Sequence, residues 1–111
     1  MSSRSGALEA IDRILNRGGD ADDVLRDVLR VLHERGAAWA AIRFVEEGEL
    51  VDGPSVGERT NGVAVPVVYQ GRKVGELEAS VEDRIFLERV AQLISAHVLV
   101  GWDTGGEAWA P

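Results

Sequence analysis

The first third of the chain places apolar residues at helical spacing, in two runs that glycines terminate. In residues 8–16 they share one side of a helix: Leu8, Ile11, Ile14 and Leu15. In residues 20–35 they form a broader face: Val24, Leu25, Val28, Leu29, Val31 and Leu32. Spacings of three and four residues are typical of amphipathic helices, and glycine is favoured just past a helix end. The pattern predicts two helices, ending near Gly18 and Gly36.

After Gly36 the hydrophobic period changes to two, as expected for strands. In residues 39–45 one face holds Ala40, Ile42 and Phe44, and the other holds Trp39, Ala41, Arg43 and Val45. Runs at residues 49–51, 63–69 and 73–80 predict further strands, and residues 52–62 predict a polar loop. Pro66 cannot donate a ladder hydrogen bond, so its strand is expected at a sheet edge or beside a bulge.

The last apolar run predicts a helix from Ser80 to about Val100, ended by Gly101. From Leu93 onward its apolar residues cover more than one face. This distribution indicates burial on two sides, by the sheet and by a second subunit.

Together these elements predict one α+β domain. Its antiparallel sheet has about four to five strands, with the N- and C-terminal helices packed on one face. A chain of 111 residues suits a single core. We expect a disordered N-terminus at residues 1–6, the domain at residues 7–101 and a C-terminal tail at residues 102–111.

Three short strings resemble the GAF domain family: VPVVYQGRKVGEL at residues 65–77, FLERVAQLI at residues 86–94 and DVLRDVL at residues 23–29. The resemblance implies a GAF/PAS-like sheet with a small-molecule pocket on the face away from the helices. Members that bind cyclic nucleotides, bilins or haem usually insert a long segment that roofs this pocket. Here the loop from Gly53 to Gly62 is short, and the cysteines of the bilin-binding and methionine-sulfoxide reductase branches are missing.

Composition narrows the partners and the chemistry. The chain has 19 acidic and 12 basic residues, a net charge of −7, and no basic cluster, so nucleic acid is excluded as a partner. It has no cysteine, which removes disulfides, thiolate nucleophiles and redox chemistry through cysteine. Neither a secretory signal nor an apolar run of membrane-spanning length is found. We therefore expect a cytoplasmic location and no membrane partner.

Side chains alternate between the two faces of a strand, and this alternation places a candidate ligand site on the sheet face away from the helices, the open face. Its residues are Trp39, Arg43, Glu76 and Glu78. In a GAF-like sheet the first and last strands are neighbours, so Arg43 can pair with either glutamate while Trp39 offers a flat surface. The alternative is a solvated face whose salt bridge contributes at most about 1 kcal/mol.

The histidines and the tail suggest partner contacts rather than chemistry. His33 and His97 lack the further ligands that a metal or haem needs, so no metal and no cofactor are predicted. No serine or threonine is paired with a histidine as an activated nucleophile, so an enzyme is not expected. The candidate partner-binding residues are His97, Leu99, Trp102 and Trp109.

Two functions of different class remain open. The first is a non-catalytic sensory or regulatory domain that binds a small molecule. The second is a ligand-free scaffold, GAF-like or roadblock-like, that pairs with itself as a homodimer or with a signalling protein.

Overall fold

The computed structural model describes the backbone of residues 3–108 and the side chains of residues 6–99. In chain order the elements are α1 (Ser3–Arg17), α2 (Ala21–Glu34), β1 (Trp39–Glu46), β2 (Glu49–Gly57), β3 (Val63–Tyr69), β4 (Arg72–Ala79) and α3 (Arg84–Ala108). The chain thus contains three helices and four strands in the predicted order within these residues.

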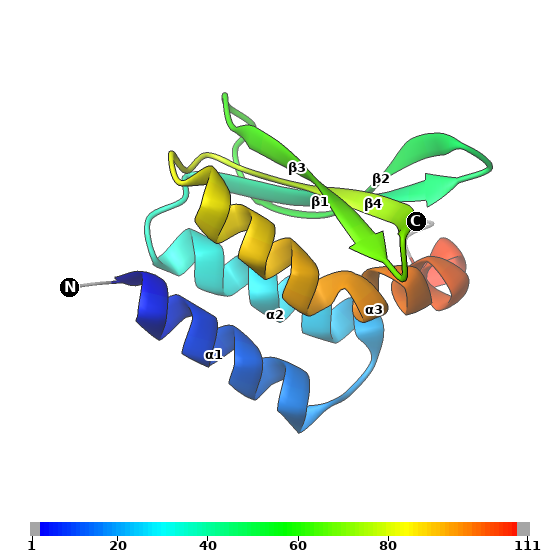
Figure 1. Ribbon diagram of the computed structural model, residues 1–111, viewed down its shortest axis with the longest axis horizontal. Coiled ribbons are helices and arrows are strands. Elements are labelled where there is room, and N and C mark those ends of the chain that lie inside the picture. The colour runs from blue at the N-terminus through cyan, green and yellow to red at the C-terminus, as the bar shows by residue number, and fades with distance from the viewer. Residues whose placement is uncertain (1–2, 109–111) are drawn as a thin grey trace.

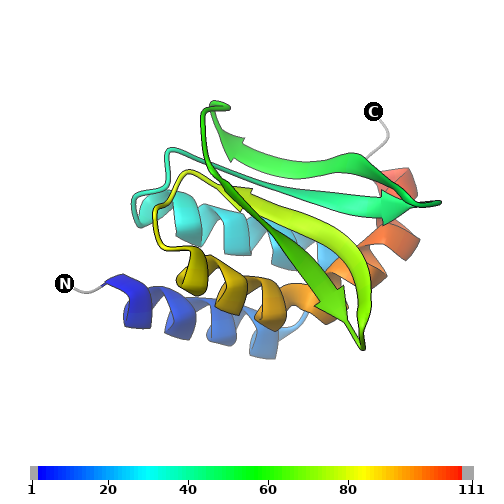
Figure 2. The same ribbon diagram turned by 45° about the horizontal axis from the view of Figure 1, so that its top comes forward.

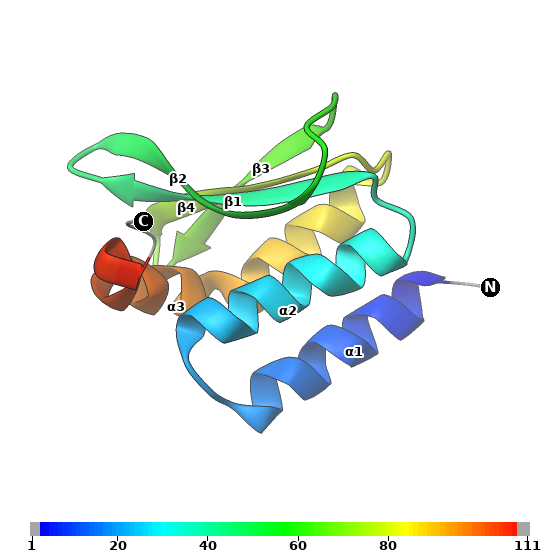
Figure 3. The same ribbon diagram turned by 180° about the vertical axis from the view of Figure 1, so that it is seen from behind.

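The four strands form one antiparallel sheet in the order β2-β1-β4-β3. Strands β1 and β2 form one hairpin, and strands β3 and β4 form the other. The two hairpins join where β1 pairs with β4 at the centre of the sheet. The connection from β2 to β3 therefore crosses from one edge of the sheet to the other. It rises at one end of the sheet, on the side away from the helices (Figures 1 and 2). Within residues 3–108, no helix covers this face of the sheet (Figures 1 and 3).

The helices lie on the opposite face in two tiers. Helices α2 and α3 lie against the sheet, and α1 packs on their outer side, as seen from both directions in Figures 1 and 3. This arrangement confirms the predicted α+β fold with the terminal helices on one face.

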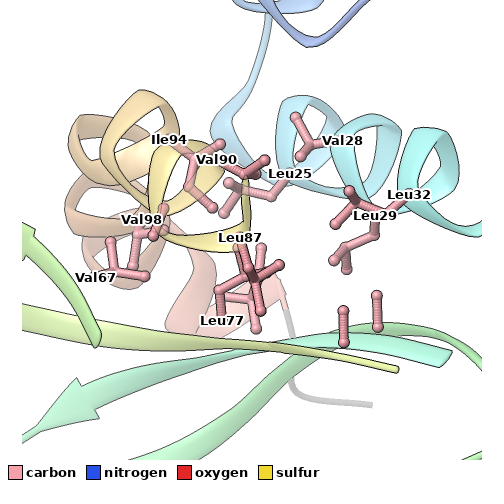
Figure 4. Close-up of a cluster of buried hydrophobic side chains, with 14 of the residues drawn as sticks. Leu25, Val28, Leu29, Leu32, Val67, Leu77, Leu87, Val90, Ile94 and Val98 are labelled. Atoms are coloured by element: carbon pink, nitrogen blue, oxygen red, sulfur yellow. The ribbon is translucent and has the colours of Figure 1, made fainter. Parts of the chain in front are cut away.

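The core fills the space between the sheet and the two inner helices (Figure 4). Leu25 and Leu29 of α2 meet Leu87 and Ile94 of α3 above Leu77 of β4, and all five are fully buried. Burying an apolar side chain of this size contributes about 1.5–3 kcal/mol. These positions are the ones that the helical and strand periods select.

Strand β2 is longer than predicted, because it runs to Gly57 rather than ending at Val51. Its pairing with β1 shifts by one residue at Gly53 and Pro54, where a bulge bends the strand. A Cβ on Gly53 would overlap the Phe44 ring and lie 2.8 Å from the carbonyl oxygen of Ile42. Residues 52–57 of the predicted polar loop therefore belong to an edge strand that lies close to β1, and only residues 58–62 connect it to β3.

Pro66 lies in β3, an edge strand, one residue before a register shift between Val67 and Val68. The prediction that its strand lies at an edge or beside a bulge is confirmed. The missing amide hydrogen costs no ladder bond where no further strand pairs.

Helix α3 differs from its prediction at both ends. It begins at Arg84, where the Phe86 amide donates to Asp83 Oδ1 at 3.0 Å and caps the helix. It continues past Gly101 to Ala108. Glycine inside a helix costs only about 1 kcal/mol relative to alanine, so without proline it need not end the helix. Across residues 3–108, none of the helices has the length and apolar character needed to cross a membrane.

Candidate functional site

The open sheet face carries an ion cluster centred on Arg43. Arg43 of β1 lies directly between Asp52 of β2 and Glu76 of β4 in the strand register. Its Nη1 lies 2.9 Å from Glu78 Oε1 and 3.6 Å from Glu76 Oε1, and its Nε lies 3.5 Å from Asp52 Oδ1. The structure thus brings three of the four predicted ligand residues together, and adds Asp52.

Charge in this cluster is unbalanced. Besides Arg43, one further cation is present, since Lys73 Nζ lies 3.2 Å from Glu76 Oε2. Two cations therefore face three carboxylates. The side chain of Glu78 is 17% exposed, whereas that of Asp52 is 90% exposed. Asp52 is the carboxylate through which the cluster can accept a further cation from solution.

The side chain of Trp39 is covered, which corrects the expectation that it offers an open, flat surface to a ligand. It is only 3% exposed although it belongs to the face away from the helices. The guanidinium carbon of Arg59 lies 5.0 Å from the centroid of its ring, which is a cation–π contact. Arg59 belongs to the connection between β2 and β3, so the connection supplies a partial roof despite its shortness.

The space between these groups is a pocket of about 250 Å³. It is lined by Trp39, Ala41, Ile42, Arg43, Asp52, Gly53, Ser55, Gly57 and Arg59. Pockets for drug-sized ligands measure roughly 300–1,000 Å³, so this one suits a smaller molecule. Of the predicted ligand residues, Trp39 and Arg43 line it, while Glu76 and Glu78 contact Arg43 from the neighbouring strand.

A larger hollow of about 470 Å³ lies at the other end of the sheet, beside the two hairpin turns. Its lining includes Glu47, Arg72, Lys73 and Leu99. None of the predicted ligand residues lines it, and it holds no aromatic side chain. We therefore place the candidate site in the smaller pocket.

The predicted partner-binding residues are only partly described. His97 is partly buried on α3, its Nδ1 has no hydrogen-bond partner, and burial lowers its pKa from 6.5. Leu99 is partly buried. The Trp102 side chain and the whole of Trp109 lie outside the described residues. The predicted partner surface and homodimer therefore stay predictions.

Among the side chains that the structure describes, no group of three or more histidines, cysteines, aspartates or glutamates is arranged so that it could hold a metal ion. The carboxylates of the open face surround Arg43 instead.

The sequence matches no family model and no curated protein. Solved structures do share its fold. Free methionine-R-sulfoxide reductase from Neisseria meningitidis, in complex with its substrate, is 16% identical, with a TM-score of 0.72 over 94% of this chain and 95% of that one. The Staphylococcus aureus enzyme, also with substrate, is 11% identical, with a TM-score of 0.74 over 88% of this chain and 97% of that one.

A GAF domain has the same architecture. It comes from the phosphoenolpyruvate-protein phosphotransferase of Acinetobacter and is 13% identical, with a TM-score of 0.69 over 93% of this chain and 97% of that one. The chain therefore has a GAF-like fold, and the resemblance seen in the sequence is confirmed. At these identities the likeness shows the fold alone.

The comparisons contradict the prediction of a non-catalytic sensory or interaction module and the prediction that the chain is not an enzyme. Three of the similar structures are methionine-R-sulfoxide reductases, a third coming from Thermoplasma acidophilum at 19% identity. The prediction that the chain is not an enzyme rested on the lack of a serine or threonine paired with a histidine and on the lack of cysteine. Missing cysteines exclude only a thiolate supplied by the chain itself.

Proposed function

We propose that the open-face pocket binds free methionine-R-sulfoxide, or another free amino acid of similar size and charge. The observation that carries the proposal is the pocket itself, which combines an aromatic ring, an exposed carboxylate and arginine side chains in about 250 Å³. Two reductases of the same fold have been solved with their substrate bound.

The chemistry of the pocket suits the ammonium end of such a ligand. Asp52 is exposed and only loosely paired, because its Oδ1 lies 3.5 Å from Arg43 Nε. The cluster has one carboxylate more than it has cations. An ammonium group at Asp52 gains a charge-assisted hydrogen bond. Arg43 acts as a positioning residue on β1 that holds the carboxylates of β2 and β4 together.

The pocket also suits the side chain of the ligand, which carries the sulfoxide. Trp39 forms part of the pocket wall with Arg59 over its ring and only 3% of the residue exposed, and sulfur and methyl groups pack favourably at the edge of an aromatic ring. Ser55 lines the same pocket and its hydroxyl can donate to a sulfoxide oxygen.

Reduction in this pocket needs a two-electron donor from a second molecule, since the chain has no cysteine, and the donor class that we propose is a thiol. The balanced reaction joins one sulfoxide with two thiols and yields a thioether, a disulfide and water. The sulfur of the sulfoxide is reduced by two electrons, and the two thiols are oxidised. The chain's own contribution is to bind and orient the sulfoxide.

Isothermal titration calorimetry with L-methionine-R-sulfoxide tests this proposal. We expect saturable binding by the unchanged chain and a loss of roughly tenfold or more in affinity for Asp52→Asn, which removes a charged hydrogen-bond partner. Asp20→Asn is the matched control, since Asp20 is exposed and makes no side-chain cap bond. A parallel assay with dithiothreitol measures whether the bound sulfoxide is reduced. Absence of binding at millimolar ligand would overturn the proposal.

A further inference from the structure

Among the residues that the structure describes, Arg59 has no carboxylate partner, in contrast to Arg43. Arg43 lies within 4.0 Å of three carboxylates, whereas among the described residues no ion pair or hydrogen bond involves Arg59. Its contact is with an uncharged surface, the ring of Trp39. The N–H groups of a guanidinium lie in the plane of the group. When the guanidinium stacks on a ring, these N–H groups remain free to donate hydrogen bonds to a planar anion.

The backbone beneath this contact is firmly held. The Trp39 amide donates to Ser80 Oγ at 2.9 Å, and the Ser80 amide donates to the Trp39 carbonyl at 2.9 Å. Two residues before Arg59, the chain leaves β2 at Gly57 with φ +81°, and a Cβ there would overlap the Ala38 carbonyl oxygen. Trp39 and the start of the connection are therefore fixed relative to each other, which places Arg59 at the rim of the pocket.

We propose that Arg59 is a specificity-determining residue that binds the free carboxylate of the ligand, an inference that rests on the proposed function. Arg59 and Asp52 line the same pocket, so they present a cation and an anion to the two charged ends of one zwitterion. A methionine sulfoxide inside a peptide lacks both the free ammonium and the free carboxylate. The pocket is therefore selective for the free amino acid.

The test compares L-methionine-R-sulfoxide with its primary amide, which keeps the ammonium and the sulfoxide but lacks the carboxylate. We expect the unchanged chain to bind the acid about tenfold to a hundredfold more tightly than the amide, the range for a charged hydrogen-bonded pair. Arg59→Gln should lose that preference by binding the acid more weakly while its affinity for the amide is unchanged.

Two further variants keep the result interpretable. Arg59→Lys retains the charge but not the fork, so we expect a preference intermediate between those of the unchanged chain and Arg59→Gln. Arg72→Gln makes the same charge change at the hollow beside the hairpin turns and should keep the full preference. Melting temperatures of all variants are measured alongside to confirm folding.

The outcomes separate the two proposals. Equal preference for the acid in the unchanged chain and in Arg59→Gln overturns the role of Arg59 and leaves the proposed function standing. If neither acid nor amide binds to the unchanged chain, the proposed function fails and the role of Arg59 fails with it.

Discussion

The guanidinium of Arg43 on β1 donates to the carboxylate of Glu78 on β4, with Nη1 and Oε1 2.9 Å apart. The two residues lie on the two central strands and on the face without helices. Their side chains are 16% and 17% exposed, so water screens this pair less than an ion pair at the surface.

Replacing Arg43 tests how much this pair stabilises the fold. Arg43→Gln leaves Asp52, Glu76 and Glu78 without their shared cation, and we expect the free energy of unfolding to fall by about 1–3 kcal/mol. Urea denaturation at pH 7 measures the change. Arg84→Gln removes a more exposed pair with Glu88, 3.2 Å apart within α3, and should cost less than about 0.5 kcal/mol. Equal effects from the two variants would contradict the stabilising role of the cluster.

The core prediction concerns Leu77, which is fully buried on β4 beneath α3. Leu77→Ala should lower the free energy of unfolding by about 2–5 kcal/mol, because it removes buried methyl groups and leaves a cavity. Val68→Ala on β3 is the control. Val68 is 45% exposed, so its loss should change stability by less than about 0.5 kcal/mol. Chemical denaturation of both variants compares them directly.

The bulge in β2 can be tested at Gly53. A Cβ there would overlap the ring of Phe44, which is fully buried, so Gly53→Ala should destabilise the fold by about 1–3 kcal/mol. Gly6→Ala is a contrasting variant, since its Cβ would meet only the flexible end of Arg35, 2.9 Å away. Alanine favours the helix by about 1 kcal/mol, so this variant should be neutral or stabilising. A tolerated Gly53→Ala would show that β2 can move away from β1.

His97 gives a prediction for pH. Desolvation lowers the pKa of His97 in the folded state below its ordinary value of 6.5. Below about pH 6.5 the unfolded chain therefore binds more protons than the folded chain, and stability falls as the pH falls toward the folded-state pKa. Above that range His97 is neutral in both states and adds no pH dependence.

We expect His97→Leu to lose less stability than the unchanged chain between pH 7.5 and pH 5.5, measured by thermal and urea unfolding. His33→Gln is the control for loss of an imidazole, because His33 lies at the end of α2 with Nδ1 2.8 Å from the Ala37 carbonyl oxygen. If His97→Leu and the unchanged chain have the same pH profile, burial of His97 does not affect acid stability.

Most of the fold follows from local periodicity. Alternation in residues 39–45 separates Phe44, which is buried in the core, from Arg43 on the open face. The pairing of Arg43 with Glu76 and Glu78 follows from the same alternation once β1 and β4 are neighbours. These features depend on the side-chain period and on strand order, and both could be predicted.

Asp52 and Arg59 could not be predicted in the same way. Their contribution depends on a bulge at Gly53 and on the path of a connection that crosses the sheet, and neither has a local periodic signal. The same path buries Trp39, which alternation alone leaves open. The available signal was a Gly-Pro pair after a β-rich run, which is typical of a bulge as well as of a loop.

The most direct test of the ligand site is a titration of the 15N-labelled chain with L-methionine-R-sulfoxide, followed by two-dimensional NMR. We expect saturable shifts of the backbone amides around one pocket, those of Trp39, Arg43, Asp52 and Arg59. The amides of Glu47 and Arg72, at the other hollow, should stay unchanged. Shifts confined to that hollow, or no shifts at millimolar ligand, would contradict the account.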